Sequence, residues 1–333
     1  VHAHPALELA IIAAGSHLVP PAVTFREVKA FAQSLGLPIA DSVPMQLAGR
    51  TGREDDAESV GRGVARFVRA FQGTRPDWVV VLGDRIEAFA AASAASIGGW
   101  ALAHVHGGDR AEGVADEAMR HAISKLAHVH LAATRESGER LVRMGEDAAR
   151  VHVVGSPAID ELAGVPALTD DAARALPGSA ESGAGRGAGG IAEGGRGADV
   201  RTVVLLHPAG LGSDAERAVA RATFEGVALA AGEAAVLALE PNLDPGRDVV
   251  LDELRRAAAA HGWLVRQHLP RDVFVGLLKR LRAGRGVLVG NSSAGLIECA
   301  ALGVPGVNVG PRQAGRERAG NVTDVLQGGA SAP

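Results

Sequence analysis

The stretch DWVVVLGDRIEAFAAASAASIGGWALAHVHGGDRAEGVADEAMRHAISKLAHVH, residues 77–130, decides the fold class. It contains two apolar runs, Trp78–Gly83 and Ala101–Val105, each followed directly by charged or imidazole side chains. Such uniform, β-branched-rich runs predict parallel strands buried on both faces. Because ligands bind beyond the carboxyl ends of strands in open α/β sheets, we expect both polar clusters to face one crevice.

The polar clusters combine carboxylates, an arginine and an imidazole, the groups needed for proton transfer near an anionic substrate. They contain Asp84, Glu87, Asp109, Asp116, Glu117, Arg120 and His121. The spacing of Glu117, Arg120 and His121 places all three on one face of a predicted helix. A solvated helix start remains the alternative for the acidic pair at 116 and 117, because the helix dipole favours acidic first turns.

A metal site is a second alternative, because His104, His106 and Asp109 form an H-x-H-x-x-D string. No further carboxylate-rich or cysteine-rich string completes a coordination set, so the sequence favours a protein without a bound metal.

Composition excludes several classes of protein. The net charge is −4 and no basic stripe is present, so no nucleic-acid partner is expected. No apolar run reaches 18 residues and no basic segment precedes Leu7, so neither a membrane span nor a signal peptide is expected. The single cysteine, Cys299, excludes an intrachain disulfide and fits a cytoplasmic location.

Strand-like and helix-like segments alternate throughout, which predicts doubly wound parallel sheets. A chain of 333 residues suggests two domains. We expect a first domain over residues 1–163, a flexible Gly/Ala-rich insertion over 164–200, and a second domain over 201–333. The insertion's glycines do not predict a phosphate loop, because no strand leads into them. The second domain has five strand-like runs, Thr202–Pro208, Ala234–Asn242, Trp263–Gln267, Gly286–Ser293 and Pro305–Gly310.

GNSSAGLIE, residues 290–298, predicts an anion site in the second domain. A strand ends at Gly290, and a helix is expected to begin near Ala294. Hydroxyls of Ser292 and Ser293 and free N–H groups of the first turn would suit a diphosphate, although ordinary serine capping is the alternative. The arginine-rich segment 312–321 would add a second clamp on phosphates.

Taken together, these motifs resemble the hydrolysing UDP-N-acetylglucosamine 2-epimerases. The matching strings are GDRIEAFAAASAA, AHVHGGDRAEGVADEAMRHAISKLAHVH, VGSPAID, HPA, PNLDPG, GNSSAGLIECAALGVPGVNVG and RQAGRERAGNV. The resemblance implies an α/β fold of two Rossmann-like domains of the glycosyltransferase-B type with an interdomain cleft. It also implies a UDP-sugar substrate, no cofactor, and a homo-oligomer, a dimer or a tetramer.

The resemblance also assigns expected roles to individual residues. The catalytic set facing the sugar would be Asp84, Asp109, Glu117 and His207. The diphosphate would contact Ser292 and Ser293, and the ribose would contact Glu298. Further substrate-binding residues would be Arg85, Glu87, His106, Arg120, His121, Asn242, Arg312, Gln313 and Arg316.

The implied chemistry is removal of the C2 proton with loss of UDP, then addition of water to give N-acetylmannosamine. Three departures from the family favour weak turnover: Asp109 stands where glutamate is usual, and the family's first strand and last helices have no counterpart before Leu7 or soon after Asn321. On this view Asp109→Glu should raise turnover. The alternatives are a nucleotide-sugar-binding homologue with little turnover and a glycosyltransferase of the same fold.

Overall fold

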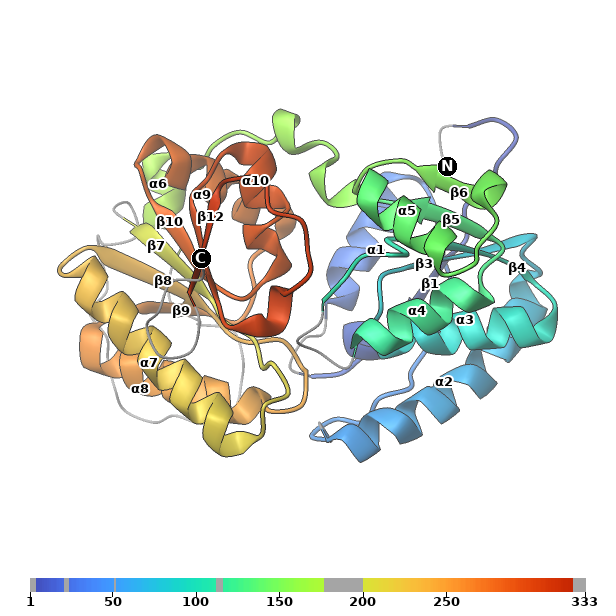
Figure 1. Cartoon of the computed structure of the whole chain (residues 1–333), viewed down its shortest axis with the longest axis horizontal. Coiled ribbons are helices and arrows are strands. Elements are labelled where there is room, and N and C mark those ends of the chain that lie inside the picture. Colours follow the sequence, from blue (N-terminus) through green and yellow to red (C-terminus); the bar gives the residue numbers. More distant parts are fainter. Residues whose placement is uncertain (1–3, 21–23, 51, 112–115, 177–199, 326–333) are drawn as a thin grey trace. The chain divides into compact units, whose positions relative to one another are not determined.

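The computed structural model describes residues 4–20, 24–50, 52–111, 116–176 and 200–325. The chain divides into two compact units, Val1–Ser156 and Pro157–Pro333 (Figure 1). The division falls at Ser156, slightly ahead of the expected domain boundary at residue 163.

The first unit alternates parallel strands with helices, as the sequence predicts. Its strands are β1 (Ile11–Ala14), β2 (Ile39–Val43), β3 (Trp78–Leu82), β4 (Ala101–Val105), β5 (Val129–Ala132) and β6 (Val151–Val153). Its α-helices are α1 (Phe25–Ser34), α2 (Arg53–Thr74), α3 (Ile86–Gly98), α4 (Asp116–Leu126) and α5 (Arg135–Arg143).

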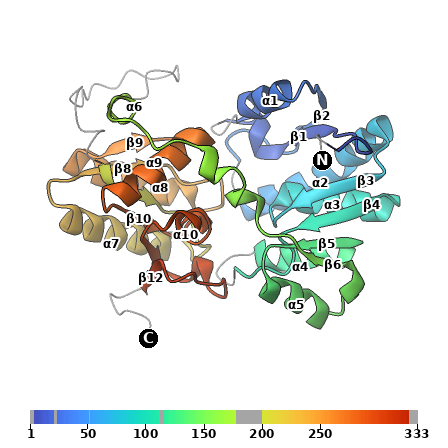
Figure 2. The same ribbon diagram turned by 90° about the horizontal axis from the view of Figure 1, so that it is seen from above.

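The strands of the first unit form two parallel sheets, one of order β3-β4-β5-β6 and a separate pair β1-β2 (Figure 2). Helices α2 and α3 cover one face, where Phe67 and Phe71 pack with Val79 and Val81 in the core. This leaves β3 buried on one side only.

The prediction that β3 is buried on both faces is therefore wrong. Trp78, Val80 and Leu82 are 50%, 59% and 57% exposed. They alternate with the buried Val79 and Val81, because successive side chains of a strand point to opposite faces. β3 also lies at the edge of its sheet, so it has a neighbouring strand, β4, on one side only.

The second unit contains the larger sheet. Its strands are β7 (Val200–Leu205), β8 (Ala235–Leu239), β9 (Leu264–Arg266), β10 (Val287–Gly290), β11 (Gly306–Val309) and β12 (Val322–Val325). Its α-helices are α6 (Asp170–Arg174), α7 (Ser213–Ala231), α8 (Arg247–His261), α9 (Arg271–Ala283) and α10 (Glu298–Leu302).

This sheet is parallel, with the order β12-β11-β10-β7-β8-β9, and it is covered on both faces (Figure 1). Leu237 packs on the side of α9, whereas Val236 and Ala238 pack on the side of α7 and α8. Cys299 is fully buried in the α9 layer, and burial raises the pKa of its thiol to about 12. The predicted doubly wound α/β architecture is confirmed.

The predicted insertion at 164–200 is only partly described, because residues 177–199 lie outside the described part. Residues 164–176 contain α6, and Leu168 and Leu176 pack into the core of the second unit. These residues therefore differ from the flexible segment that their composition predicts. In the described residues, no helix is long and apolar enough to cross a membrane.

Candidate functional site

The first polar cluster lies just beyond β3. Asp84 follows Gly83 at the strand end, and its Oδ2 accepts a hydrogen bond from Nη2 of Arg120 on α4. Arg120 is only 2% exposed. Each charge of this pair depends on the other, because burial removes the water that would otherwise solvate it.

Glu117 holds the segment that follows β4. Its Oε2 accepts from the backbone N–H of Ala111 at 2.9 Å, and its Oε1 lies 3.5 Å from Nε2 of His121. Arg110 approaches the same carboxylate at 3.6 Å. The three residues predicted to share one helix face therefore have different partners. Glu117 and His121 contact one another, whereas Arg120 bonds Asp84.

Glu87 and Arg85 lie at the start of α3. Glu87 Oε1 accepts from the backbone N–H of Ser16 at 3.0 Å, and its Oε2 lies 3.6 Å from Nε of Arg85. Glu87 therefore ties the loop after β1 to the start of α3, which is a structural role inside the predicted site.

Asp109 stands at the centre of a side-chain network beyond β4. Its Oδ2 lies 2.8 Å from Nδ1 of His106, and its Oδ1 accepts from the hydroxyl of Ser137 at 2.7 Å. The other ring nitrogen of His106 lies 2.9 Å from Oγ of Ser156. Both carboxylate oxygens are thus engaged, by partners from separate elements.

Two backbone features bring this network together. His106 has a φ of +65°, a left-handed conformation that costs energy for a residue with a Cβ and is often found at functional sites. Gly108 has a φ of +79°, and a Cβ there would collide with the carbonyl oxygen of Ser137. Glycine therefore allows the loop after β4 to approach α5, which places Asp109 against Ser137.

The histidines and the aspartate of the H-x-H-x-x-D string bond other protein groups in the structure. Buried His104 bonds the carbonyl of Gly83 through Nε2 at 2.8 Å and the hydroxyl of Ser124 through Nδ1 at 3.1 Å. His106 bonds Asp109, as described above. No group of three potential metal ligands is found among the described residues.

Burial also lowers the pKa of His104 from 6.5 to about 4, so the ring is neutral in the folded protein at neutral pH. The unfolded chain binds this proton more readily, and stability should therefore fall as the pH drops from about 6.5 to about 4. The loss should be about 3 kcal/mol. Urea unfolding across this range measures it. His104→Gln should reduce the pH dependence, although His130 still contributes, because burial lowers its pKa too. An unchanged slope would contradict the assignment to His104.

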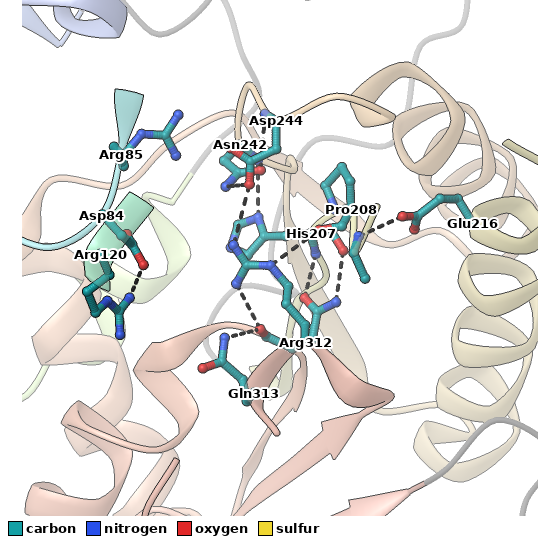
Figure 3. A network of polar contacts seen from close by, with 12 residues as sticks. Asp84, Arg85, Arg120, His207, Pro208, Glu216, Asn242, Asp244, Arg312 and Gln313 are labelled. Atoms are coloured by element: carbon teal, nitrogen blue, oxygen red, sulfur yellow. Dashed lines mark hydrogen bonds and ion pairs between the residues drawn. The ribbon is translucent and has the colours of Figure 1, made fainter. Parts of the chain in front are cut away.

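The second cluster lies beyond β7, β8 and β10 of the second unit (Figure 3). Nδ1 of His207 accepts from the backbone N–H of Asn242 at 3.1 Å. The side chain of Asn242 donates to Asp244 at 2.6 Å. Asn291 bonds both the N–H and the carbonyl oxygen of His207, at 2.7 and 2.8 Å. Three loops therefore meet at His207.

Arg312 and Gln313 brace these loops from beyond β11 (Figure 3). The guanidinium of Arg312 donates to the carbonyls of Pro208 and Asn291, each at 3.2 Å, and lies 3.4 Å from Asp244. Gln313 donates to the carbonyl of Asn291 at 2.9 Å. The described contacts of Arg312 are those of a loop brace, whereas the sequence predicts a phosphate clamp.

Glu216 on α7 holds the loop after β7. Its Oε1 accepts from the backbone N–H groups of Ala209 and Leu211, at 2.6 and 3.1 Å, although the residue is buried. A buried carboxylate that accepts two backbone donors fixes this loop beside His207.

The predicted helix near Ala294 is wrong in form. Ser293–Gly295 is a single 3₁₀ turn, and α10 spans only Glu298–Leu302. Ser292 caps the turn, accepting from the N–H of Ala294 at 3.3 Å. Gly290 permits the close approach of β10 to β7, because a Cβ there would collide with the carbonyl of Leu205.

Glu298 and Arg316, two further predicted substrate-binding residues, follow the GNSS turn in the second unit. Glu298 begins α10, and its Oε1 lies 3.8 Å from Arg271. Arg316 follows the 3₁₀ turn Pro311–Gln313, and its carbonyl accepts from Arg318 at 2.7 Å. The side chain of Asp116 lies outside the described residues.

The predicted residues divide between the units. The first unit holds Asp84, Arg85, Glu87, His106, Asp109, Glu117, Arg120 and His121; the second holds His207, Asn242, Ser292, Ser293, Glu298, Arg312, Gln313 and Arg316. Sequence reasoning missed Ser137, Ser156, Glu216, Asp244 and Asn291. Ser156, Asp244 and Asn291 do lie inside the quoted strings GSPAID, PNLDPG and GNSS, which was the available signal.

Comparison with known proteins gives consistent matches along the chain. The family model described as UDP-N-acetylglucosamine 2-epimerase matches residues 1–329. A UDP-N,N′-diacetylbacillosamine 2-epimerase (hydrolyzing) from Legionella pneumophila is 33% identical over 327 residues, which are 98% of this chain and 79% of that protein. A UDP-N-acetylglucosamine 2-epimerase from Neisseria meningitidis is 27% identical, over 94% of this chain and 74% of that protein.

Among solved structures, the Methanocaldococcus jannaschii UDP-GlcNAc 2-epimerase in complex with UDP-GlcNAc and UDP has a similar fold. The TM-score is 0.64 at 19% identity, covering 90% of this chain and 77% of that one. A putative UDP-N-acetylglucosamine 2-epimerase from Listeria monocytogenes matches with the same TM-score at 18% identity, covering 90% of this chain and 71% of that one.

Proposed function

Because this chain belongs to the UDP-N-acetylglucosamine 2-epimerase family, we propose that it hydrolyses a UDP-2-acetamido sugar to UDP and the 2-epimer of the free sugar. UDP-N-acetylglucosamine, giving N-acetylmannosamine, is the first candidate substrate. UDP-N,N′-diacetylbacillosamine, named for the Legionella relative, is the second. The observation that carries the proposal is the group of carboxylates, arginine and imidazole that follows β3 and β4.

The proposed reaction has two steps. A base removes the C2 proton, the C–H electron pair forms the C1=C2 double bond, and the C1–O bond breaks with its electrons leaving on UDP. Water then adds its oxygen to C1, and an acid returns a proton to C2 on the opposite face. Asp84, Asp109 and Glu117 are the proposed acid–base groups, and the second unit, with Ser292, Ser293 and Glu298, is proposed to bind UDP.

The test is incubation of the protein with UDP-N-acetylglucosamine in heavy water, followed by NMR of the products. Free N-acetylmannosamine with deuterium at C2, together with UDP, supports the proposal. Product with only protium at C2 rules out proton abstraction. A UDP-linked epimer indicates the non-hydrolysing reaction, and bound but unchanged substrate indicates a binding protein.

Removing both hydroxyls of the GNSS turn should weaken UDP binding. Ser292→Ala with Ser293→Ala is expected to cost about 1–3 kcal/mol of binding free energy, because hydrogen bonds to a charged phosphate are lost. Isothermal titration calorimetry with UDP measures the change. Ser213→Ala, at the start of α7, is the control. UDP affinity equal to that of the parent protein would assign Ser292 to capping alone.

A further inference from the structure

His207 is fixed at its backbone by one buried side chain. The carboxamide of Asn291 accepts from the N–H of His207 and donates to its carbonyl oxygen, at 2.7 and 2.8 Å. Asn291 is 3% exposed, and its own backbone N–H continues the sheet by donating to Leu205 at 3.2 Å. We call these two hydrogen bonds between the Asn291 carboxamide and the His207 backbone the clasp. Because β10 and β7 are neighbours, the clasp connects His207 to the centre of the sheet.

The imidazole of His207 is fixed in a second way, which determines its tautomer. Nδ1 lies 3.1 Å from the backbone nitrogen of Asn242. A backbone N–H only donates, so Nδ1 must present its lone pair. The neutral ring then carries its proton on Nε2, and protonation of Nδ1 would cost the bond to Asn242.

The position of Asn242 is itself determined by its neighbours. Its side chain donates to Asp244, which lies 3.4 Å from Arg312, and Arg312 also donates to the carbonyl of Asn291. The donor to Nδ1 and the clasp on the backbone therefore belong to one network (Figure 3). A change at Asn291 should alter both the position and the tautomer of His207.

We propose that Asn291 is a positioning residue that holds His207 as an Nε2–H hydrogen-bond donor to an oxygen of the nucleotide sugar. This role rests on the function proposed above and refines it, because it makes His207 a donor and leaves the base among the carboxylates of the first unit. A preorganised donor suits an oxygen that gains negative charge, as the departing diphosphate does.

The tautomer is tested directly by ¹⁵N NMR of the imidazole groups in the intact, uniformly labelled protein without substrate. The chain has 12 histidines, so His207 is assigned by the signals that disappear in His207→Gln. We expect an unprotonated Nδ1 and a protonated Nε2 at neutral pH. A protonated Nδ1 would overturn the inference, whether or not the protein turns over a nucleotide sugar.

The positioning role is tested with Asn291→Ala and Asn291→Asp, the second of which keeps the acceptor but loses the donor to His207. Both should give mixed His207 tautomers and lower kcat by about 10- to 100-fold, with a smaller change in KM. The control is Asn308→Ala, which removes a buried asparagine bonded to Asp324 at 2.7 Å instead. If the parental tautomer and kcat persist in the Asn291 variants, or if Asn308→Ala has the same effects, Asn291 is not the positioning residue.

Discussion

Asp109→Asn is expected to lower turnover of UDP-N-acetylglucosamine by about 10²- to 10⁴-fold, the range for loss of a general acid–base group or of the carboxylate that orients one. The asparagine NH₂ would face either His106 or Ser137, each of which now donates to a carboxylate oxygen. UDP release measured with a coupled assay gives kcat and KM. Asp252→Asn, an exposed carboxylate on α8, is the matched control, and near-parental turnover by Asp109→Asn would remove Asp109 from the catalytic set.

The structure reverses the expectation for Asp109→Glu. The resemblance to the family, in which glutamate is usual at this position, implies that aspartate is one methylene too short and predicts a gain in turnover. In the structure both oxygens of Asp109 already meet partners at 2.7–2.8 Å. An added methylene must displace the carboxylate by about 1 Å and break one of these bonds, so we expect turnover to fall. A rise in kcat for Asp109→Glu would restore the first expectation.

The second large effect is expected at the ion pair of Asp84 and Arg120. Asp84→Leu leaves the buried guanidinium without its carboxylate and should cost about 3–5 kcal/mol of the free energy of unfolding of the first unit. Urea unfolding followed by tryptophan fluorescence measures it. In a Trp263→Phe background the remaining tryptophans, Trp78 and Trp100, both lie in the first unit.

Two controls make this prediction specific. The double variant Asp84→Leu with Arg120→Leu should recover much of the loss, because replacing both charges of a buried pair by apolar groups is often neutral. Glu139→Gln breaks a pair whose side chains are 59% and 62% exposed and should cost less than about 1 kcal/mol. Equal losses for Asp84→Leu and Glu139→Gln would contradict the burial argument.

Regular alternation of strands and helices was sufficient to predict the parallel α/β architecture, but it did not predict β2 and β12, two of the edge strands. β2 and β12 contain Asp41 and Asp324, which interrupt an apolar pattern. Both lie at the edges of their sheets, where a strand has a neighbour on one side only and tolerates polar residues. For β3 the prediction was wrong in the opposite direction. Its apolar run indicated a strand buried on both faces, but one face is exposed, because burial depends on covering layers that a local pattern does not reveal.

The sequence predicted several candidate site residues but not how they are held in place. Asp109 and His106 are three residues apart, and their contact follows a local motif. Ser137 and Asn291 reach their partners, Asp109 and His207, across 28 and 84 residues. Such contacts depend on which strands become neighbours, so a single sequence carries no local signal for them.

Cys299, fully buried against α9, gives the second unit a built-in probe. Attack on a disulfide reagent requires the thiolate, and both burial and the raised thiol pKa suppress that form in the folded state. Because the chain has one cysteine, the rate of its modification measures how often this part of the core opens. Thiol exchange at Cys299 would thus measure the rate of local opening in the second unit without an engineered label.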